Sequence, residues 1–246
     1  MCQYLPPVRR GPGRLTSARV IDLLEGMATT RAIRRIRPDP VPDDDLATML
    51  WHATRAPSGS NRQPARFVVL SDGPVATEAK ALLGRAFRAA WAEKAEADGY
   101  AAGSGGAADS PKARQARAMA AFVEGFEEIP VVVLACVIRW RAPHLTEGGS
   151  VYPACQNLLL AARALGYGGV MTMWHGLVED DLRALLGLPE GVAIAATIPL
   201  GRPEGSHGPV RRRPLGELVF EDHWEGPAPW AVDPPGTRFA GSPPRA

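Results

Sequence analysis

The chain has 246 residues, 46% of them hydrophobic, which is enough to build a buried core in one large domain. Its formal net charge of +2 is too small to predict a nucleic-acid partner. The first residues contain no apolar leader, and no later stretch is long and apolar enough to cross a bilayer. We therefore expect a cytoplasmic protein that has no membrane partner.

The cysteines and histidines do not form recognisable ligand patterns. Cys2, Cys136 and Cys155 are odd in number and lack metal-ligand spacing, so neither disulfides nor a zinc site are predicted. Cys136 and Cys155 lie in apolar runs and are expected in the core. The five histidines occur singly, without a His-Glu-x-x-His pattern. The sequence therefore predicts no metal site.

Composition divides the chain into three parts. Residues 1–15 are rich in Pro, Gly and Arg without an apolar period, and they are predicted to be a disordered tail. Residues 16–226 are expected to form the folded domain. Residues 227–246 are rich in Pro and Gly, and this second tail is expected either to wrap a partner subunit or to be disordered.

Apolar residues spaced three and four apart predict six helices. The first is expected from Thr16, with Val20, Leu23, Leu24 and Met27 on one face. The second is expected from Asp43 to about Thr54, capped by its acidic start. Two more are expected between Gly73 and Glu128, around a flexible segment at Gly99–Pro111. The last two are expected at Ala154–Leu165 and from Glu179 to Gly187.

Four apolar runs predict strands, at Phe67–Ser71, Pro130–Ile138, Gly168–Trp174 and Val192–Leu200. The unbroken apolar character of the first run predicts burial on both of its faces. Helices at both ends of this series indicate an α+β fold with a central, mostly antiparallel sheet flanked by helices. Four aromatic residues between the first two strands are expected mainly in the core: Phe87, Trp91, Phe122 and Phe126.

A polar loop, Pro57-Ser58-Gly59-Ser60-Asn61-Arg62-Gln63-Pro64, joins the second helix to the first strand. Prolines at its two ends restrict the backbone, so Ser58, Ser60, Asn61 and Gln63 could be held ready for a ligand. An ordinary polar turn is the alternative interpretation. The order of the residues distinguishes this loop from a simple cluster of polar side chains.

Two arginine clusters lie near the two ends of the predicted domain. Thr30–Pro38 contains Arg31, Arg34, Arg35 and Arg37, and Arg211–Arg213 follows the last strand. Guanidinium groups suit phosphate, because they donate paired hydrogen bonds. A solvated cationic surface is the alternative for each cluster.

The polar loop and the two arginine clusters, in this order, resemble the nitroreductase family of FMN-dependent NAD(P)H oxidoreductases. The loop is similar to its Pro-Ser-x-x-Asn-x-Gln-Pro motif, Thr30–Pro38 to its Arg-Ser-x-Arg-x-Phe signature, and Ile198–Pro203 with Arg211–Leu215 to its C-terminal segment. The resemblance spans roughly Met27 to Trp224. It implies an intertwined homodimer with two FMN molecules at the subunit interface.

The resemblance also implies which residues bind FMN. Arg31 and its neighbours contact the phosphate and ribityl chain, and Arg34 or Arg35 lies near the ring. Gln63 is expected to contact the flavin held mainly by the other chain, and Ala32 stands where the family usually has Ser. The complete implied set is Arg31, Ala32, Arg34, Arg35, Pro57, Ser58, Ser60, Asn61, Gln63, Thr172, Met173, Arg211 and Arg212.

The implied reaction is a ping-pong transfer of hydride from NADH or NADPH through FMN to a nitroaromatic, quinone or related acceptor. No side chain acts as a nucleophile, and His175 is a candidate proton donor. The lack of a Gly-x-Gly-x-x-Gly fingerprint fits a nicotinamide that visits only briefly. Alternatives are azoline oxidation, dehalogenation or flavin breakdown, flavin binding without turnover, and nucleic-acid binding by the arginine clusters, which lack interleaved aromatic residues.

Overall fold

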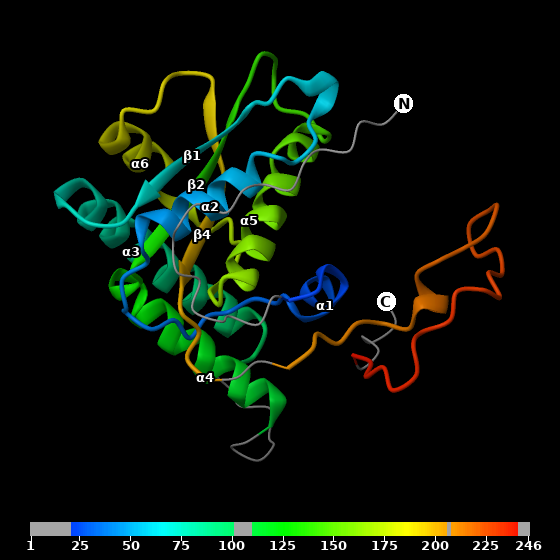
Figure 1. Ribbon diagram of the computed structural model, residues 1–246. Helices are drawn as coiled ribbons and strands as arrows, with labels where there is room; N and C mark the ends of the chain where they lie inside the picture. Colours follow the sequence, from blue (N-terminus) through cyan, green and yellow to red (C-terminus); the bar gives the residue numbers. More distant parts are fainter. Residues whose placement is uncertain (1–20, 101–109, 206–207, 241–246) are drawn as a thin grey trace.

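A computed structural model describes residues 21–100, 110–205 and 208–240. A central sheet separates two layers of helices in this part of the chain (Figure 1). The predicted N-terminal tail, Thr16, Val20 and Cys2 lie outside the described residues, as does most of the predicted flexible segment. No helix of the described ranges is long and apolar enough to span a membrane.

The sheet has four antiparallel strands in the order β1-β2-β4-β3, which confirms the predicted α+β class. Ala65 lies opposite Val137 at one end of the sheet, and Val131 lies opposite Leu200 at the other. The register between β2 and β4 shifts after Ala135. The strands are β1 (Ala65–Leu70), β2 (Val131–Ile138), β3 (Gly168–Gly169) and β4 (Val192–Gly201).

Strand β2 is buried on both faces because it lies inside the sheet with helices above and below. Alternate side chains belong to different cores: Val133 packs with one helix layer and Leu134 with the other. The predicted burial on both faces of the first strand holds in part. Phe67 and Val69 pack against one core, and Val68 and Leu70 against the other. Because β1 is an edge strand, only Leu70 is fully buried.

Helices α2 (Asp43–Ala53) and α5 (Tyr152–Ala164) cover one face of the sheet. Met49 and Leu158 are completely buried in this layer, and Cys155 packs beside them, as predicted. The predicted side-chain cap of α2 is absent. Its three aspartates lie in the first helical turn instead, where they interact favourably with the helix dipole.

The opposite face is covered by α3 (Pro74–Ala97), α4 (Pro111–Glu124) and α6 (Glu179–Leu186). Phe87 is completely buried, with its ring centroid 4.5 Å from that of Phe126 and 6.2 Å from that of Phe122. The prediction that these three aromatic side chains are core residues is confirmed. Cys136 is also buried in this layer.

Helix α1 spans Leu23–Thr29, and the predicted helical start at Thr16 lies outside the described residues. The carboxylate of Asp22 accepts hydrogen bonds from the backbone N–H groups of Leu24 (2.9 Å) and Glu25 (3.3 Å), so it caps the helix at this point. The apolar residues Leu23, Leu24 and Met27 are exposed. Helix α1 therefore presents an apolar surface that the described part of this chain does not cover.

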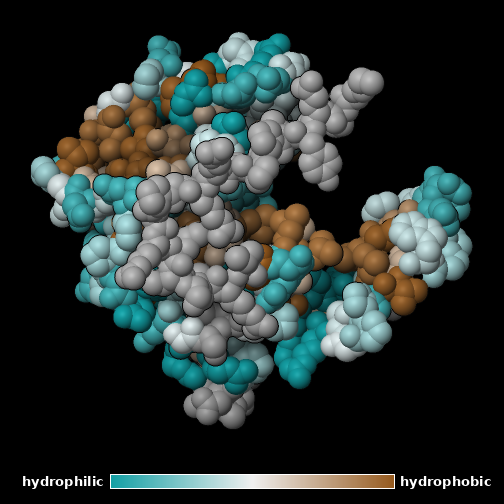
Figure 2. All heavy atoms as spheres, in the orientation of Figure 1, coloured by the Kyte–Doolittle hydropathy of each residue, from teal (hydrophilic) through white to brown (hydrophobic). Residues whose placement is uncertain are grey.

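Residues 208–240 form a C-terminal arm that extends away from the body of the molecule (Figure 1). The arm folds back on itself: the N–H of Leu215 donates to Asp233 Oδ2 (2.9 Å), and the N–H of Ala240 donates to the carbonyl of Arg212 (2.8 Å). Figure 2 shows hydrophobic residues on its surface. Its exposed large apolar side chains are Leu218, Trp224, Trp230, Val232 and Phe239.

Candidate functional site

The first arginine cluster lies beside the chain that follows β4. The backbone N–H of Arg37 donates to the carbonyl of Arg202 (2.8 Å), and that of Glu204 donates to the carbonyl of Arg35 (2.9 Å). The N–H of Val210 reaches the carbonyl of Ala28 (3.3 Å). These bonds hold the start of the domain against the segment that leads to Arg211 and Arg212, so the two clusters are close although they are distant in sequence.

Arg34 lines a cavity of about 330 Å³, which we call the Arg34 cavity. The guanidinium is half-buried and makes no hydrogen bond or ion pair with any described residue. Burial, and then the like charge of Arg31, lowers the pKa of Arg34. A desolvated cation without a counter-ion favours an anionic or electron-rich ligand. The cavity is lined by Arg34, Met119, Phe122, Val170, Met171, Thr172, Met173 and Trp174.

Thr172 and Met173 form part of the wall of the same cavity. The N–H of Thr172 donates to the carbonyl of Thr197 (3.0 Å), and the carbonyl of Thr172 accepts from the N–H of Thr197 (2.8 Å), which fixes the backbone here. The N–H of Met173 has no partner in the described ranges. The predicted strand Gly168–Trp174 was too long, because β3 ends at Gly169 and the 3-10 turn η4 (Trp174–Val178) begins at Trp174.

The other residues of the two clusters are more exposed. A guanidinium nitrogen of Arg31 donates to the carbonyl of Gly208 (3.4 Å), and Arg35 and Ala32 are exposed beside it. Arg213 is paired with Glu217, at 2.8 Å. Exposed Arg211 and Arg212 have no carboxylate partner among the residues described. Two cations of the second cluster thus remain available to a phosphate.

The polar loop is held in a strained conformation around the 3-10 turn η1 (Gly59–Asn61). Ser60, Asn61 and Gln63 have φ angles of 51°, 52° and 51°, which non-glycine residues seldom adopt and which often mark ligand sites. Ser58 Oγ accepts from the N–H of Gln63 (2.9 Å), so it stabilises the loop. Gln63 Nε2 donates to Asn61 Oδ1 (3.1 Å). This bond leaves the amide NH₂ of Asn61 and the amide oxygen of Gln63 without partners in the described chain, as one free donor and one free acceptor.

Within one chain the polar loop lies far from the Arg34 cavity. The carbonyl of Pro64 accepts from the N–H of Ile138 at the end of β2 (3.0 Å), whereas Arg37 lies beside Arg202, next to the start of β2. Eight strand residues rising about 3.3 Å each place these two ends about 25 Å apart. Thr172 lies between them, because its partner Thr197 is opposite Leu134 in the middle of β2. The structure therefore brings Arg34 together with Thr172 and Met173, and places Pro57–Gln63 at the other end of β2 from the arginine segment.

His175 does not face any of these groups. Its ring is buried, with Nε2 2.9 Å from the carbonyl oxygen of Ile194 and Nδ1 3.2 Å from Thr197 Oγ1. Both ring nitrogens are engaged in the core. The hypothesis that His175 donates a proton to substrate is therefore wrong for this arrangement.

Burial lowers the pKa of His175, although the Ile194 carbonyl and Glu179 oppose the shift. Its folded pKa lies below the unfolded value of about 6.5, so the unfolded chain takes up the proton first on acidification. We expect the free energy of unfolding to fall as the pH drops below about 7, and to fall less steeply in His175→Gln. Urea unfolding of both proteins at several pH values measures the difference, and equal slopes would exclude this role.

Residues 27–202 match the model of the nitroreductase family. The chain belongs to the nitroreductase family. An NADH dehydrogenase of Thermus thermophilus is 32% identical in an alignment of 218 residues that covers 82% of this chain and 96% of that protein. The family assignment confirms the prediction that the chain is an oxidoreductase.

Solved nitroreductase-fold structures resemble this chain in architecture. A nitroreductase of Desulfovibrio desulfuricans in complex with FMN is 25% identical, with a TM-score of 0.57 over 82% of this chain and 96% of that chain. An iodotyrosine deiodinase bound to FMN and 3-iodo-L-tyrosine is 22% identical, with a TM-score of 0.60 over 82% of this chain and all of that chain. These similarities confirm the nitroreductase-like fold.

Sequence reasoning missed one group of residues in this nitroreductase-family chain. A second cavity lies between the polar loop and the segment that follows β2, and its walls include Arg62, Trp140 and Arg141. The alternation Arg139-Trp140-Arg141 directly after a buried strand was the available signal. It could not be interpreted without knowing that Arg62 lies opposite.

Proposed function

We propose that the chain is an NADH- or NADPH-dependent FMN oxidoreductase that reduces nitroaromatic, quinone or related acceptors in a ping-pong cycle. The observation that carries the proposal is Arg34, whose half-buried guanidinium has no partner in the described ranges and faces a cavity. A cation in this position favours a ligand whose ring gains negative charge on reduction. Family membership and the FMN bound to the Desulfovibrio relative support the same cofactor.

The residues present fit FMN. FMN bound here would supply the redox chemistry between the nicotinamide and the acceptor. Arg34 would stabilise negative charge at the ring, and the free N–H of Met173 would be available to donate to it. Arg31 with Arg211 or Arg212 holds the phosphate. Ala32 contributes no hydroxyl, so the arginines carry more of the binding.

The division of the site supports an intertwined homodimer with two FMN molecules at its interface. Because the polar loop lies at the opposite end of β2 from Arg34, the loop of one chain serves the flavin held by its partner. Asn61 and Gln63 then offer their free amide groups to the ring edge. The exposed apolar residues of α1 and of the C-terminal arm would be buried against the partner, which would link assembly to cofactor binding.

A shared site predicts complementation between inactive chains. Arg34→Gln and Asn61→Ala homodimers each carry a defect in both sites, whereas a mixed dimer has one intact site. Random mixing of equal amounts should restore about one quarter of wild-type activity per chain, because half of the dimers are mixed and each has one good site of two. The measurement is turnover after co-refolding differently tagged chains.

A matched control uses Arg34→Gln with Arg31→Gln, which belong to the same proposed half-site. In a mixed dimer of these two chains, one site carries the Arg34 defect and the other carries the Arg31 defect. No site is intact, so mixing should restore no activity. Recovery in the control, or none in the Arg34 and Asn61 pair, would contradict a site shared between subunits.

Steady-state kinetics under anaerobic conditions test the reaction itself. With NADH or NADPH as donor and a nitroarene or quinone as acceptor, double-reciprocal plots at several acceptor concentrations should be parallel. Donor consumption without dependence on any such acceptor would instead indicate a specialised reaction of the family. If flavin is bound but neither donor is oxidised, the result would indicate a flavin-binding protein without turnover.

A further inference from the structure

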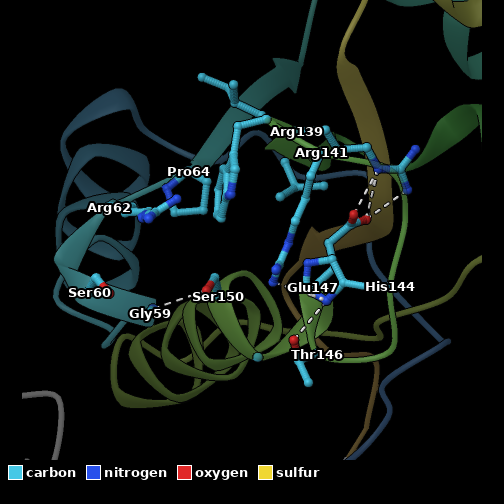
Figure 3. Close-up of a pocket in the computed structure, with 14 residues that line it drawn as sticks. Gly59, Ser60, Arg62, Pro64, Arg139, Arg141, His144, Thr146, Glu147 and Ser150 are labelled. Carbon is cyan, nitrogen blue, oxygen red and sulfur yellow. Dashed lines mark hydrogen bonds and ion pairs between the residues drawn. The ribbon is translucent and has the colours of Figure 1, made fainter.

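The second cavity, which we call the Trp140 cavity, has a volume of about 390 Å³ and opens beside the polar loop (Figure 3). Its size lies within the range of small-molecule sites. In Figure 3 the side chain of Arg141 runs into the space between Arg62 and Pro64 on one side and Glu147 and His144 on the other. The charge and the aromatic surface of this cavity decide which ligand it suits.

The only carboxylate in the lining is already engaged. Glu147 accepts three hydrogen bonds from Arg139, at 2.7, 2.9 and 3.0 Å. These bonds hold the pKa of Glu147 below its ordinary value, so the pair is neutral as a unit over the normal pH range. Glu147 therefore does not compensate the other two arginines.

Arg62 and Arg141 are the uncompensated cations of the cavity. Neither forms an ion pair with a carboxylate anywhere in the described chain. The one hydrogen bond of the Arg141 side chain to a described residue is a long contact of 3.4 Å with His144 Nδ1, which also lies 2.7 Å from Thr146 Oγ1. Two guanidinium groups that converge on one hollow without an acid favour an anion there.

An aromatic wall accompanies these charges. The guanidinium of Arg62 lies 4.7 Å from the ring centroid of Trp140, and the indole is still 50% exposed. The stacking restrains Arg62 while leaving ring surface for a second planar group. The hydroxyl-bearing residues Ser60 and Ser150 complete the polar lining.

We propose that the Trp140 cavity binds a small aromatic carboxylate, with Arg62 and Arg141 on the carboxylate and Trp140 against the ring. Ser60 lines the cavity and adjoins Asn61, so this site lies next to the loop that serves the partner's flavin. This inference rests on the proposed function, and it makes acidic nitroarenes the preferred acceptors. Their reduction is balanced as ArNO₂ + NAD(P)H + H⁺ giving ArNO, NAD(P)⁺ and water.

The test compares 4-nitrobenzoate with its neutral analogue 4-nitrobenzamide. Isothermal titration of the oxidised, FMN-loaded protein without donor should give at least about tenfold tighter binding of the carboxylate. The double variant Arg62→Gln with Arg141→Gln should reduce this ratio to about one. Arg55→Gln is the matched control, because its guanidinium lies 4.9 Å from the Trp51 ring outside the cavity, and it should keep the wild-type ratio.

Equal affinity for the two compounds, or a preference that survives in the double variant, would overturn the inference. The same solutions then receive NADH or NADPH under anaerobic conditions. An anion preference that depends on the two arginines, without reduction of any acceptor, would support the site and contradict the proposed function. Reduction of acceptors without the preference would contradict the site alone.

Discussion

Arg34→Gln is expected to raise the dissociation constant for FMN about 10- to 100-fold, the value of charge-assisted hydrogen bonds to one guanidinium. The reason is that Arg34 is a half-buried cation without a partner in the described chain, lining a cavity with Thr172 and Met173. The variant should also lower the reduction potential of bound flavin, because the charge that stabilises the reduced ring is lost. Fluorescence titration of the apoprotein with FMN measures the first effect, and dye-linked potentiometry the second.

Arg37→Gln is the matched control in the same segment. Its guanidinium lies 2.6 Å from Asp39 in an exposed ion pair, which contributes less than about 1 kcal/mol to stability. FMN affinity and potential should therefore stay at wild-type values. If Arg34→Gln bound FMN as tightly as Arg37→Gln, the assignment of the flavin ring to the Arg34 cavity would be wrong.

Gly169→Ala is expected to disturb both the fold and the site. A Cβ at this position would collide with the carbonyl oxygen of Pro199 and lie 2.7 Å from Leu200 Cδ2. The carbonyl of Gly169 accepts from the N–H of Ile33 at 2.8 Å, so any shift is passed to the arginine segment. We expect the free energy of unfolding to fall by about 3 kcal/mol and the melting temperature to fall by about 5–10 °C.

FMN content after purification should fall together with stability in Gly169→Ala. Gly26→Ala is the control, because a Cβ there meets nothing within 4 Å and the residue lies inside helix α1. That substitution should be neutral or slightly stabilising. A Gly169→Ala protein that melts and binds FMN like Gly26→Ala would show that the close contact of β3 with β4 does not position the site.

The regular elements were predictable where burial follows from local pattern. Strand β2 is apolar throughout because it is covered on both faces, and the apolar period of α2 matches Leu46, Met49 and Ala53 in the core. The apolar run of β1 indicated that both faces are covered but not that the strand lies at the edge, where most of its side chains are only partly buried, since the pairing of distant strands decides between edge and centre. No local signal in β1 carries that information.

The short length of β3 results from tertiary packing, which could not be predicted from its own residues. Gly168 and Gly169 allow Ile33 and Leu200 to approach closely, and beyond them the backbone leaves the sheet apart from the single bridge of Thr172 to Thr197 in the described chain. The end of β3 was therefore not readable from its apolar residues.

The individual residues of the candidate site could be named from the sequence only because they match family motifs. Distance along β2, rather than any motif, separates Asn61 from Arg34 within one chain. The Trp140 cavity was missed because Arg62 and Trp140 are far apart in sequence and meet only in the folded chain. Motifs name the residues, whereas tertiary contacts decide which residues can touch one ligand.

The absorbance spectrum of the purified protein, recorded without oxygen before and after addition of NADH or NADPH, tests the central proposal most directly. We expect a flavin band that bleaches when the donor is added and returns when a nitroarene or quinone follows. A flavin band that persists with both donors would contradict an NAD(P)H-dependent oxidoreductase. Protein that takes up no flavin even when FMN is supplied would contradict the proposed cofactor.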